Sequence, residues 1–294
     1  MENKIRTNNY LECSDEDFVN FTHQCFGFSD EGLKRRFKYR MTNRNIIKFK
    51  SFIGNIHDKK ILAASGSGIP LFSLLNENNG IPKFIFGFDY SPKQVAYNYL
   101  IKNAIINLNY EEFLIFFGYN KKGRRTKRVK LMREKIIKKI PSILYTFIPY
   151  NHELTKRDFI LKRNSKCSFL HSKEDYKKIK KNIQRIKFFV FRLNPFCKKS
   201  LSDIFNKDFF DFIYLSNVLD WICWHNNIQR RDIKHMFYDF KKISTKNSPV
   251  IIDHLAQRKT LLPAFLDETS NLKKTSYDLY IYNWKMYKIL LNNL

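Results

Sequence analysis

Two glycines and one acid are spaced as in a nucleoside-binding site. An apolar run that begins at Lys60 leads into Ala63-Ala-Ser-Gly-Ser-Gly68, so that Gly66 and Gly68 directly precede an apolar helix. Glycine lets the backbone approach a ligand closely, and the first turn of a helix offers free N–H groups. Asp89 stands 23 residues after Gly66, at the end of a second apolar run. A carboxylate there can accept hydrogen bonds from both ribose hydroxyls, so the spacing predicts an adenosine ligand.

The glycine turn lacks the third glycine of the dinucleotide pattern, because that position is Leu71. A pyrophosphate is therefore disfavoured, and the pattern suits S-adenosylmethionine, which carries an amine and a carboxylate instead of phosphates. After a later apolar run, Ser216 and Asn217 could face that amino-acid end, and Asp220 could accept from its ammonium group. The alternative is that Ser216 or Asn217 only caps a helix whose Trp221 lies in the core.

The elements that must position these residues alternate between strand and helix. Short apolar runs predict strands that begin at Lys60 and Lys83 and that cover 187–192, 210–216 and 248–253, with a terminal antiparallel pair within 277–289. Apolar periodicity predicts helices at 30–52, 92–108, 201–206, 217–224 and 229–243. We therefore expect an α/β fold with a doubly wound, mostly parallel sheet, a Rossmann variant.

About 100 residues separate the second strand from the third, whereas a crossover needs only a dozen or so. The periodicity there predicts helices at 94–118, 126–145 and 173–186. We therefore expect an N-terminal helical cap, a donor-binding α/β domain and a basic helical insertion within that domain, at 1–52, 53–294 and 109–186.

The composition is that of a basic globular protein. The 294 residues are 44% hydrophobic and 28% charged, and 54 Lys and Arg against 27 Asp and Glu give a net charge of +27. Such a surface favours anionic partners. No run approaches the roughly 18 apolar residues of a transmembrane helix, and the N-terminus lacks the apolar region of a secretory signal. Five widely spaced cysteines without a C-x-x-C pair argue against a disulfide framework and a zinc site, so we expect a cytoplasmic enzyme without a metal.

The strongest charge signal lies in the insertion, where residues 119–139 contain eleven Lys or Arg against Glu134 alone. The run is either a solvated face that reflects AT-rich coding or a contact surface for a phosphorylated acceptor, acidic membrane lipid or RNA phosphates. No RNA-recognition motif accompanies it. As acceptor-binding residues we predict five cations of this run and one tyrosine near the C-terminus: Lys121, Lys122, Arg124, Arg125, Arg128 and Tyr282.

Three segments resemble the donor-binding motifs of class I S-adenosylmethionine-dependent transferases: Leu62-Ala-Ala-Ser-Gly-Ser-Gly68, Gly87-Phe-Asp-Tyr-Ser-Pro-Lys-Gln94 and Tyr214-Leu-Ser-Asn-Val-Leu-Asp-Trp221. Within that superfamily the chain is similar to the 3-amino-3-carboxypropyltransferases of the betaine-lipid-synthase type, through 108–118, 23–31 and 277–282. The resemblance covers residues 22 to 288, and Ser-Asn-Val-Leu-Asp-Trp is its most distinctive part. One departure is that Ala-Ala-Ser precedes the first glycine, where methyltransferases often carry an acid.

The resemblance implies transfer of the 3-amino-3-carboxypropyl group of S-adenosylmethionine to a nucleophilic acceptor, with release of methylthioadenosine. The choice among the three sulfonium carbons is then a matter of position, since the acceptor must lie in line with the γ-carbon. The acceptor would be anionic, such as a nucleotide or peptide-nucleotide, or a lipid hydroxyl. Methyl transfer to RNA or a small molecule is the alternative.

The residues predicted to hold the donor belong to these motifs and to neighbouring segments: Ala64, Ser65, Gly66, Gly68, Asp89, Tyr90, Gln94, Asn194, Ser216, Asn217, Asp220, Arg40 and Arg44. Either arginine could clamp the donor carboxylate or belong to a solvated helix face. A hydroxyl acceptor would need a base, whereas a phosphate or carboxylate would need none. The candidate bases are His254, Asp220 and Asp253, with His23 and His225 as further histidines near the expected sheet edge. Tyr97 either lines the pocket or packs in the core.

Overall fold

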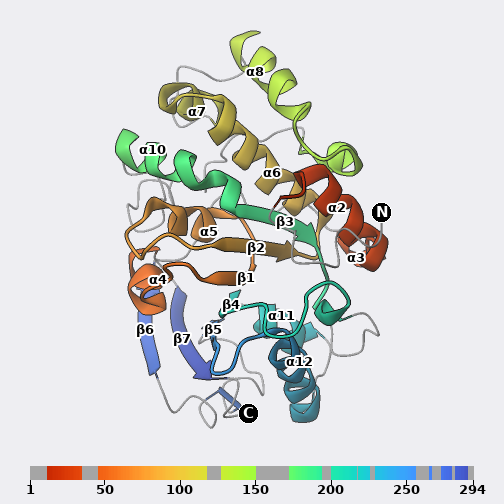
Figure 1. Cartoon of the computed structure of the whole chain (residues 1–294), viewed down its shortest axis with the longest axis vertical. Coiled ribbons are helices and arrows are strands. Elements are labelled where there is room, and N and C mark those ends of the chain that lie inside the picture. Colours follow the sequence, from red (N-terminus) through yellow and green to blue (C-terminus); the bar gives the residue numbers. More distant parts are fainter. Residues whose placement is uncertain are drawn as a thin grey trace.

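One seven-stranded sheet organises the chain (Figure 1). The computed structural model describes residues 12–34, 46–117, 127–149, 172–193, 200–216, 218–225, 229–255, 265–266, 273–279 and 282–290. The strands follow the order β3-β2-β1-β4-β5-β7-β6. Their bounds are β1 Lys60–Ala64, β2 Phe84–Asp89, β3 Ile186–Val190, β4 Phe212–Ser216, β5 Pro249–Leu255, β6 Lys273–Leu279 and β7 Tyr282–Leu290. Strands β1 to β5 pair in parallel and β7 is antiparallel to both neighbours, which confirms the predicted mostly parallel sheet.

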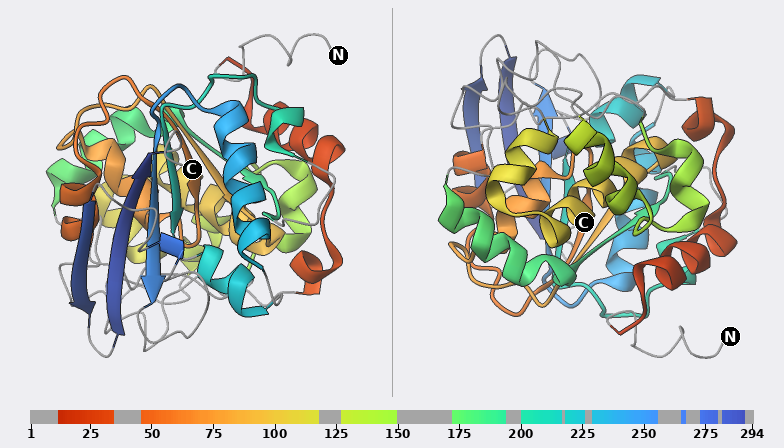
Figure 2. Two further views of the ribbon diagram at one scale, coloured as in Figure 1. Left: turned by 90° about the horizontal axis from the view of Figure 1, so that it is seen from below. Right: turned by 90° about the horizontal axis from the view of Figure 1, so that it is seen from above.

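Helices cover both faces of this sheet (Figure 2). One layer contains α4 Ile46–Ile53, α5 Ile69–Ser73, α6 Pro92–Asn107, α7 Tyr110–Phe116, α8 Lys127–Ile137 and α10 Lys173–Asn182. The other contains α11 Val218–His225 and α12 Arg230–Ile243. Helix α2, Asp15–Phe26, runs beside β3 and leads into α3, Asp30–Lys34. Parallel strands covered in this way are apolar on both sides, which explains the short unbroken apolar runs in the sequence.

The predicted helix at 94–118 is wrong in one respect, because α6 and α7 are separate helices. Leu108 is extended, and Asn109 begins α7 through a capping box. The Asn109 side chain accepts a hydrogen bond from the Glu112 N–H (2.9 Å), and the Glu112 carboxylate accepts one from the Asn109 N–H (3.1 Å). The reciprocal bonds satisfy two donors that would otherwise be open at the helix start, and so fix the break there.

Other predicted helices also differ from the structure, and the one at 201–206 is only a 3-10 helix, Leu201–Asp203. The segment predicted at 126–145 is α8 followed by a 3-10 helix, Ser142–Phe147, since Pro141 stands between them and cannot continue an α-helix. Within the segment predicted at 30–52, the described parts are α3 and α4, and residues 35–45 lie outside the described ranges.

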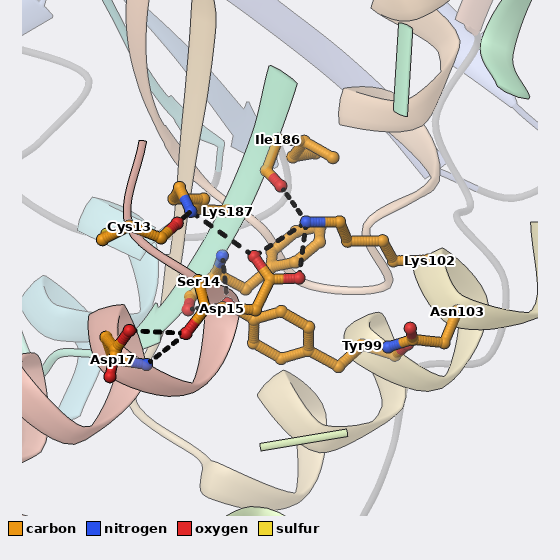
Figure 3. A network of polar contacts seen from close by, with 10 residues as sticks. Cys13, Ser14, Asp15, Asp17, Tyr99, Lys102, Asn103, Ile186 and Lys187 are labelled. Carbon is orange, nitrogen blue, oxygen red and sulfur yellow. Dashed lines mark hydrogen bonds and ion pairs between the residues drawn. The ribbon is translucent and has the colours of Figure 1, made fainter. Parts of the chain in front are cut away.

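A buried charge cluster joins the N-terminal segment to the outer edge of β3 (Figure 3). Lys102 of α6 donates to both carboxylate oxygens of Asp15 (2.8 and 2.7 Å) and to the Ile186 carbonyl (2.8 Å). Lys187 of β3 donates to the Cys13 carbonyl (2.7 Å). Lys102 therefore connects α6 and α2 to the first residue of β3, and Lys187 connects the same strand to the segment before α2.

Candidate functional site

The glycine turn follows β1 at the carboxyl end of the sheet. Gly66 and Gly68 have φ angles of 47° and 73°, in the left-handed region that favours glycine. The turn is held at its start, where the Ser65 N–H donates to the Phe88 carbonyl (2.8 Å), and it closes with a bond from the Gly68 N–H to the Ser65 carbonyl (2.7 Å). A Cβ on Gly66 would meet no described heavy atom within 4 Å. The turn therefore presents main chain to open space.

Asp89 is the last residue of β2, and β2 is the strand that pairs with β1. Ala64 is in register with Phe88, so Asp89 lies level with the start of the glycine turn. One of its carboxylate oxygens accepts a hydrogen bond from the Ser91 N–H (2.9 Å), which holds the side chain at the turn before α6. The structure thus brings the predicted glycines and the predicted acid to one edge of two adjacent strands.

Asn98 connects these two parts of the edge, and the sequence argument missed it. It is fully buried in α6, and its Nδ2 donates to the Ser65 hydroxyl (3.0 Å) and to the Gly66 carbonyl (3.2 Å). The Ser65 hydroxyl in turn donates to the Phe88 carbonyl (3.2 Å). A Cβ on Gly68 would stand 2.9 Å from Asn98 Oδ1. Glycine is therefore required there both by the close approach of Asn98 and by the left-handed φ angle. The available sequence signal was a row of polar residues at four-residue steps in this helix, Gln94, Asn98 and Lys102.

The N-terminal segment forms a wall over the carboxyl end of β2. A Cβ on Gly32 of α3 would collide with the Tyr90 carbonyl oxygen, so the two backbones lie in close contact. Arg192, just after β3, makes an ion pair with Glu31 of α3 (2.9 Å). Helix α3 is therefore fixed beside the turn that holds Asp89.

The other half of the edge is built by β4 and β5. Ser216 ends β4 with φ 55°, an uncommon conformation for a residue with a side chain, and the β4–β5 register shifts at this point. Strain of this kind often marks ligand-binding turns. Asp253 of β5 is fully buried, and one of its oxygens accepts a hydrogen bond from the Tyr214 hydroxyl (2.7 Å).

The remaining predicted residues fall into three groups. Ala64, Ser65 and Gln94 are buried beside the glycine turn and in the first turn of α6. Asp220, His254 and Tyr282 lie in α11, β5 and β7, and their side chains are outside the description. Outside the described residues altogether are Arg40, Arg44, Lys121, Lys122, Arg124, Arg125, Asn194 and Asn217.

Two more predicted positions have clear surroundings. Tyr97 packs in the core with its ring edge-on to Phe117, which confirms the packing alternative. Arg128 is exposed on α8 and pairs with Glu112 of α7 (3.2 Å), and its role toward an acceptor stays a prediction. In the described part of the chain, no three His, Cys, Asp or Glu side chains gather as metal ligands. None of the described helices has the length and apolar character needed to cross a membrane.

Comparison with known proteins yields structural neighbours only. The sequence matches no protein-family model and no curated protein. The structure is similar to an S-adenosylmethionine-dependent methyltransferase from Aquifex aeolicus, with 9% identity, a TM-score of 0.42, and coverage of 84% of this chain and 90% of the other. It is also similar to the rRNA methyltransferase aviRa from Streptomyces viridochromogenes, with 9% identity, a TM-score of 0.46, and coverage of 90% and 91%. These scores are too low for an activity to be carried over, so the function has to be inferred from the residues of this chain.

Proposed function

We propose that the chain transfers the 3-amino-3-carboxypropyl group of S-adenosylmethionine to a nucleophilic acceptor and releases methylthioadenosine. The observation that supports donor binding best is the left-handed turn at Gly66 and Gly68 beside the carboxylate of Asp89, on adjacent strands. The choice of the transferred group rests on the resemblance of 214–221 and of the segments around it to the aminocarboxypropyltransferases.

The residues at the edge fit the donor chemically. The open main chain at Gly66 suits the amino-acid end of the donor, because that end can exchange hydrogen bonds with backbone groups. Asp89, held in place by the Ser91 N–H, can accept from the ribose hydroxyls. Ser216, in its left-handed conformation, turns the chain sharply where β4 meets the same edge. We assign these residues to the two ends of one elongated ligand.

In the proposed reaction, a lone pair of the acceptor forms a bond to the γ-carbon of the donor while the γ-carbon–sulfur bond breaks. The bonding electrons go to the sulfonium sulfur, which becomes the neutral thioether of methylthioadenosine. Asp253 is a poor candidate for the base that a hydroxyl acceptor needs, since it is fully buried and already binds the Tyr214 hydroxyl. This favours an anionic acceptor, which needs no base, and leaves His254 and Asp220 as candidate bases otherwise.

We place the acceptor's anionic part near the basic insertion. Lys127 and Lys130 are exposed on α8, and Lys138 and Lys139 are exposed directly after it. None of these four lysines makes an ion pair with an acidic side chain of the described residues. On α10, by contrast, Lys173 and Lys181 pair with Glu111 and Glu77 (3.7 and 3.6 Å). Unpaired lysines leave positive charge available for a phosphate or carboxylate.

The direct test of donor binding is Asp89→Ala. Losing two charge-assisted hydrogen bonds, worth roughly 1.5–3 kcal/mol each, should weaken S-adenosylmethionine binding at least tenfold by titration calorimetry. Asp211→Ala is the matched control, because Asp211 accepts the Lys60 N–H (2.9 Å) before β4, at the opposite end of the sheet. Unchanged affinity in Asp89→Ala would exclude the ribose assignment.

Product analysis decides which group moves. Incubation with donor labelled in the carboxypropyl carbons and with a cell extract should label an acceptor and release methylthioadenosine. Release of S-adenosylhomocysteine would instead establish methyl transfer, which the same turn and acid could support. Changing Lys121, Lys122, Arg124, Arg125 and Arg128 together to Gln should raise the extract concentration for half-maximal labelling and leave the donor dissociation constant alone. An equal effect on both would mean that these side chains only support folding.

A further inference from the structure

We infer that Asn98 is a positioning residue of the donor site, one that fixes the glycine turn to the end of β2 through its side-chain amide. The inference rests on the proposed function, since it names what holds the proposed donor site in shape. Asn98 belongs to neither of the two segments that it joins, because it lies in the second turn of α6.

The contacts of Asn98 reach both parts of the edge. Its Nδ2 donates to the Gly66 carbonyl (3.2 Å), and so fixes a main-chain group in the middle of the left-handed turn. It also donates to the Ser65 hydroxyl (3.0 Å). That hydroxyl donates a hydrogen bond to the Phe88 carbonyl (3.2 Å), one residue before Asp89. The Ser65 N–H also donates to the Phe88 carbonyl (2.8 Å), and the amide of Asn98 and the hydroxyl of Ser65 add side-chain bonds to this main-chain contact between the turn and the end of β2.

The orientation of this amide follows from its neighbours. The Gly66 carbonyl can only accept, and the Ser65 hydrogen is used by Phe88, so both neighbours need a donor and the Nδ2 group must face them. Oδ1 then points toward Gly68, and within the described part of the chain this buried atom accepts no hydrogen bond. A buried acceptor without a partner costs stability. We therefore explain the buried amide by its hydrogen bonds to the glycine turn, and not by a contribution to the stability of the core.

Asn103 of the same helix is a buried asparagine whose side chain, within the described part of the chain, bonds only to the backbone of the helix itself. Asn103 is also buried, and its Nδ2 donates to the Tyr99 carbonyl (3.0 Å), one turn back along α6. That bond stays within the helix and touches neither the glycine turn nor β2. Asn103 therefore serves as a control of the same residue type, burial and helix.

The experiment compares Asn98→Leu with Asn103→Leu in the full chain. Leu approximates the shape of Asn and removes the amide, so both variants should lower the melting temperature. Only Asn98→Leu should weaken S-adenosylmethionine binding, by about tenfold, in titration calorimetry below the melting temperature of both proteins. Amide hydrogen exchange at Ser65–Gly68 should rise in Asn98→Leu alone. Asn98→Ser, a smaller change, should give an intermediate affinity and provides the comparison if Asn98→Leu does not fold.

The outcomes separate the two proposals. If the unaltered protein does not bind S-adenosylmethionine, the proposed function fails. If it binds and Asn98→Leu and Asn98→Ser bind equally well, Asn98 is not a positioning residue, although the proposed function stands. If Asn103→Leu weakens binding as much as Asn98→Leu, the effect is a general loosening of α6, and the inference is overturned. The inference is supported if donor affinity falls about tenfold in Asn98→Leu and not in Asn103→Leu, and if amide hydrogen exchange rises at Ser65–Gly68 in Asn98→Leu alone.

Discussion

Helix α6 carries two buried polar clusters one turn apart, and they differ in how completely their hydrogen bonds are satisfied. At Lys102, all three ammonium hydrogens have acceptors, namely the two oxygens of Asp15 and the Ile186 carbonyl. At Asn98, both amide hydrogens are used, yet Oδ1 has no donor among the described residues. The first cluster holds the N-terminal segment against β3 (Figure 3), and the second faces the turn that we assign to the donor.

The difference indicates which cluster is shaped by folding and which by a ligand. A buried charge is tolerated only when its partners are in place, so the Lys102 cluster has to be complete for the protein to fold. The Asn98 cluster is neutral, and an incomplete set of hydrogen bonds there costs far less. Exceptions to the rule that buried polar atoms are hydrogen-bonded occur most often at functional sites. Of these two clusters, the one with the exception, Asn98 Oδ1, lies beside the open main chain of Gly66.

The largest effect should come from removing one partner of the charged cluster. Asp15→Asn leaves Lys102, which is 1% exposed, without its counter-charge, and we expect a loss of about 3–5 kcal/mol in the free energy of unfolding measured with urea. Donor affinity of the folded protein should be unchanged. Asp17→Asn is the control, since Asp17 is an exposed acid in the same helix turn, and its hydrogen bonds within the described part of the chain are with Ser14, three residues away. A small loss in Asp15→Asn would remove the distinction between the clusters.

The same variant should respond to pH in a defined direction. Burial lowers the pKa of the Lys102 ammonium group, while Asp15 partly restores it. With its folded pKa below the unfolded one, Lys102 takes up a proton on unfolding in the interval between the two, so its contribution to stability rises with pH there. Without Asp15 the folded pKa falls further. The stability deficit of Asp15→Asn should therefore shrink between pH 7 and pH 10, and a constant deficit would contradict this account.

An intermediate effect should follow from crowding the second cluster. In Gly68→Ala, the methyl group would lie 2.8 Å from a ring carbon of Phe72 and 2.9 Å from Asn98 Oδ1, in addition to the strain of φ 73°. We expect a loss of about 1–3 kcal/mol in stability, together with weaker donor binding. Gly66→Ala adds strain without crowding and should cost less stability. Equal costs in urea unfolding would show that backbone strain alone, and not the contact with Asn98, matters at the turn.

The sheet and half of the site were predictable from local patterns. The parallel strands are buried on both faces, so each appears as an apolar run, and Gly66, Gly68 and Asp89 follow such runs directly. The helix break at Leu108 was also readable, because Asn109 and Glu112 have the spacing of a capping box.

The two clusters of α6 were not predictable in the same way. Lys102 and Asp15 are 87 positions apart, and no local pattern indicates that they pair. Asn98 is 33 positions from Ser65, and its role depends on how α6 packs under the glycine turn. What the sequence does show is a row of polar residues at four-residue steps along one face of the helix, Gln94, Asn98 and Lys102. That pattern indicates buried polar contacts without naming the partners.

The smallest effect should come from a lysine–acid pair that differs from the Lys102 pair mainly in burial. Lys173 of α10 lies 3.7 Å from Glu111 of α7, with the two side chains 63% and 62% exposed. Water and salt screen such a pair, so Lys173→Ala should change the free energy of unfolding, measured with urea, by less than about 0.5 kcal/mol. Added salt should change this difference by no more than the same amount. A loss near that of Asp15→Asn would mean that ion pairing itself, and not the burial of Lys102, stabilises the chain. The contrast between the buried charged cluster and the neutral one at the glycine turn would then need another cause.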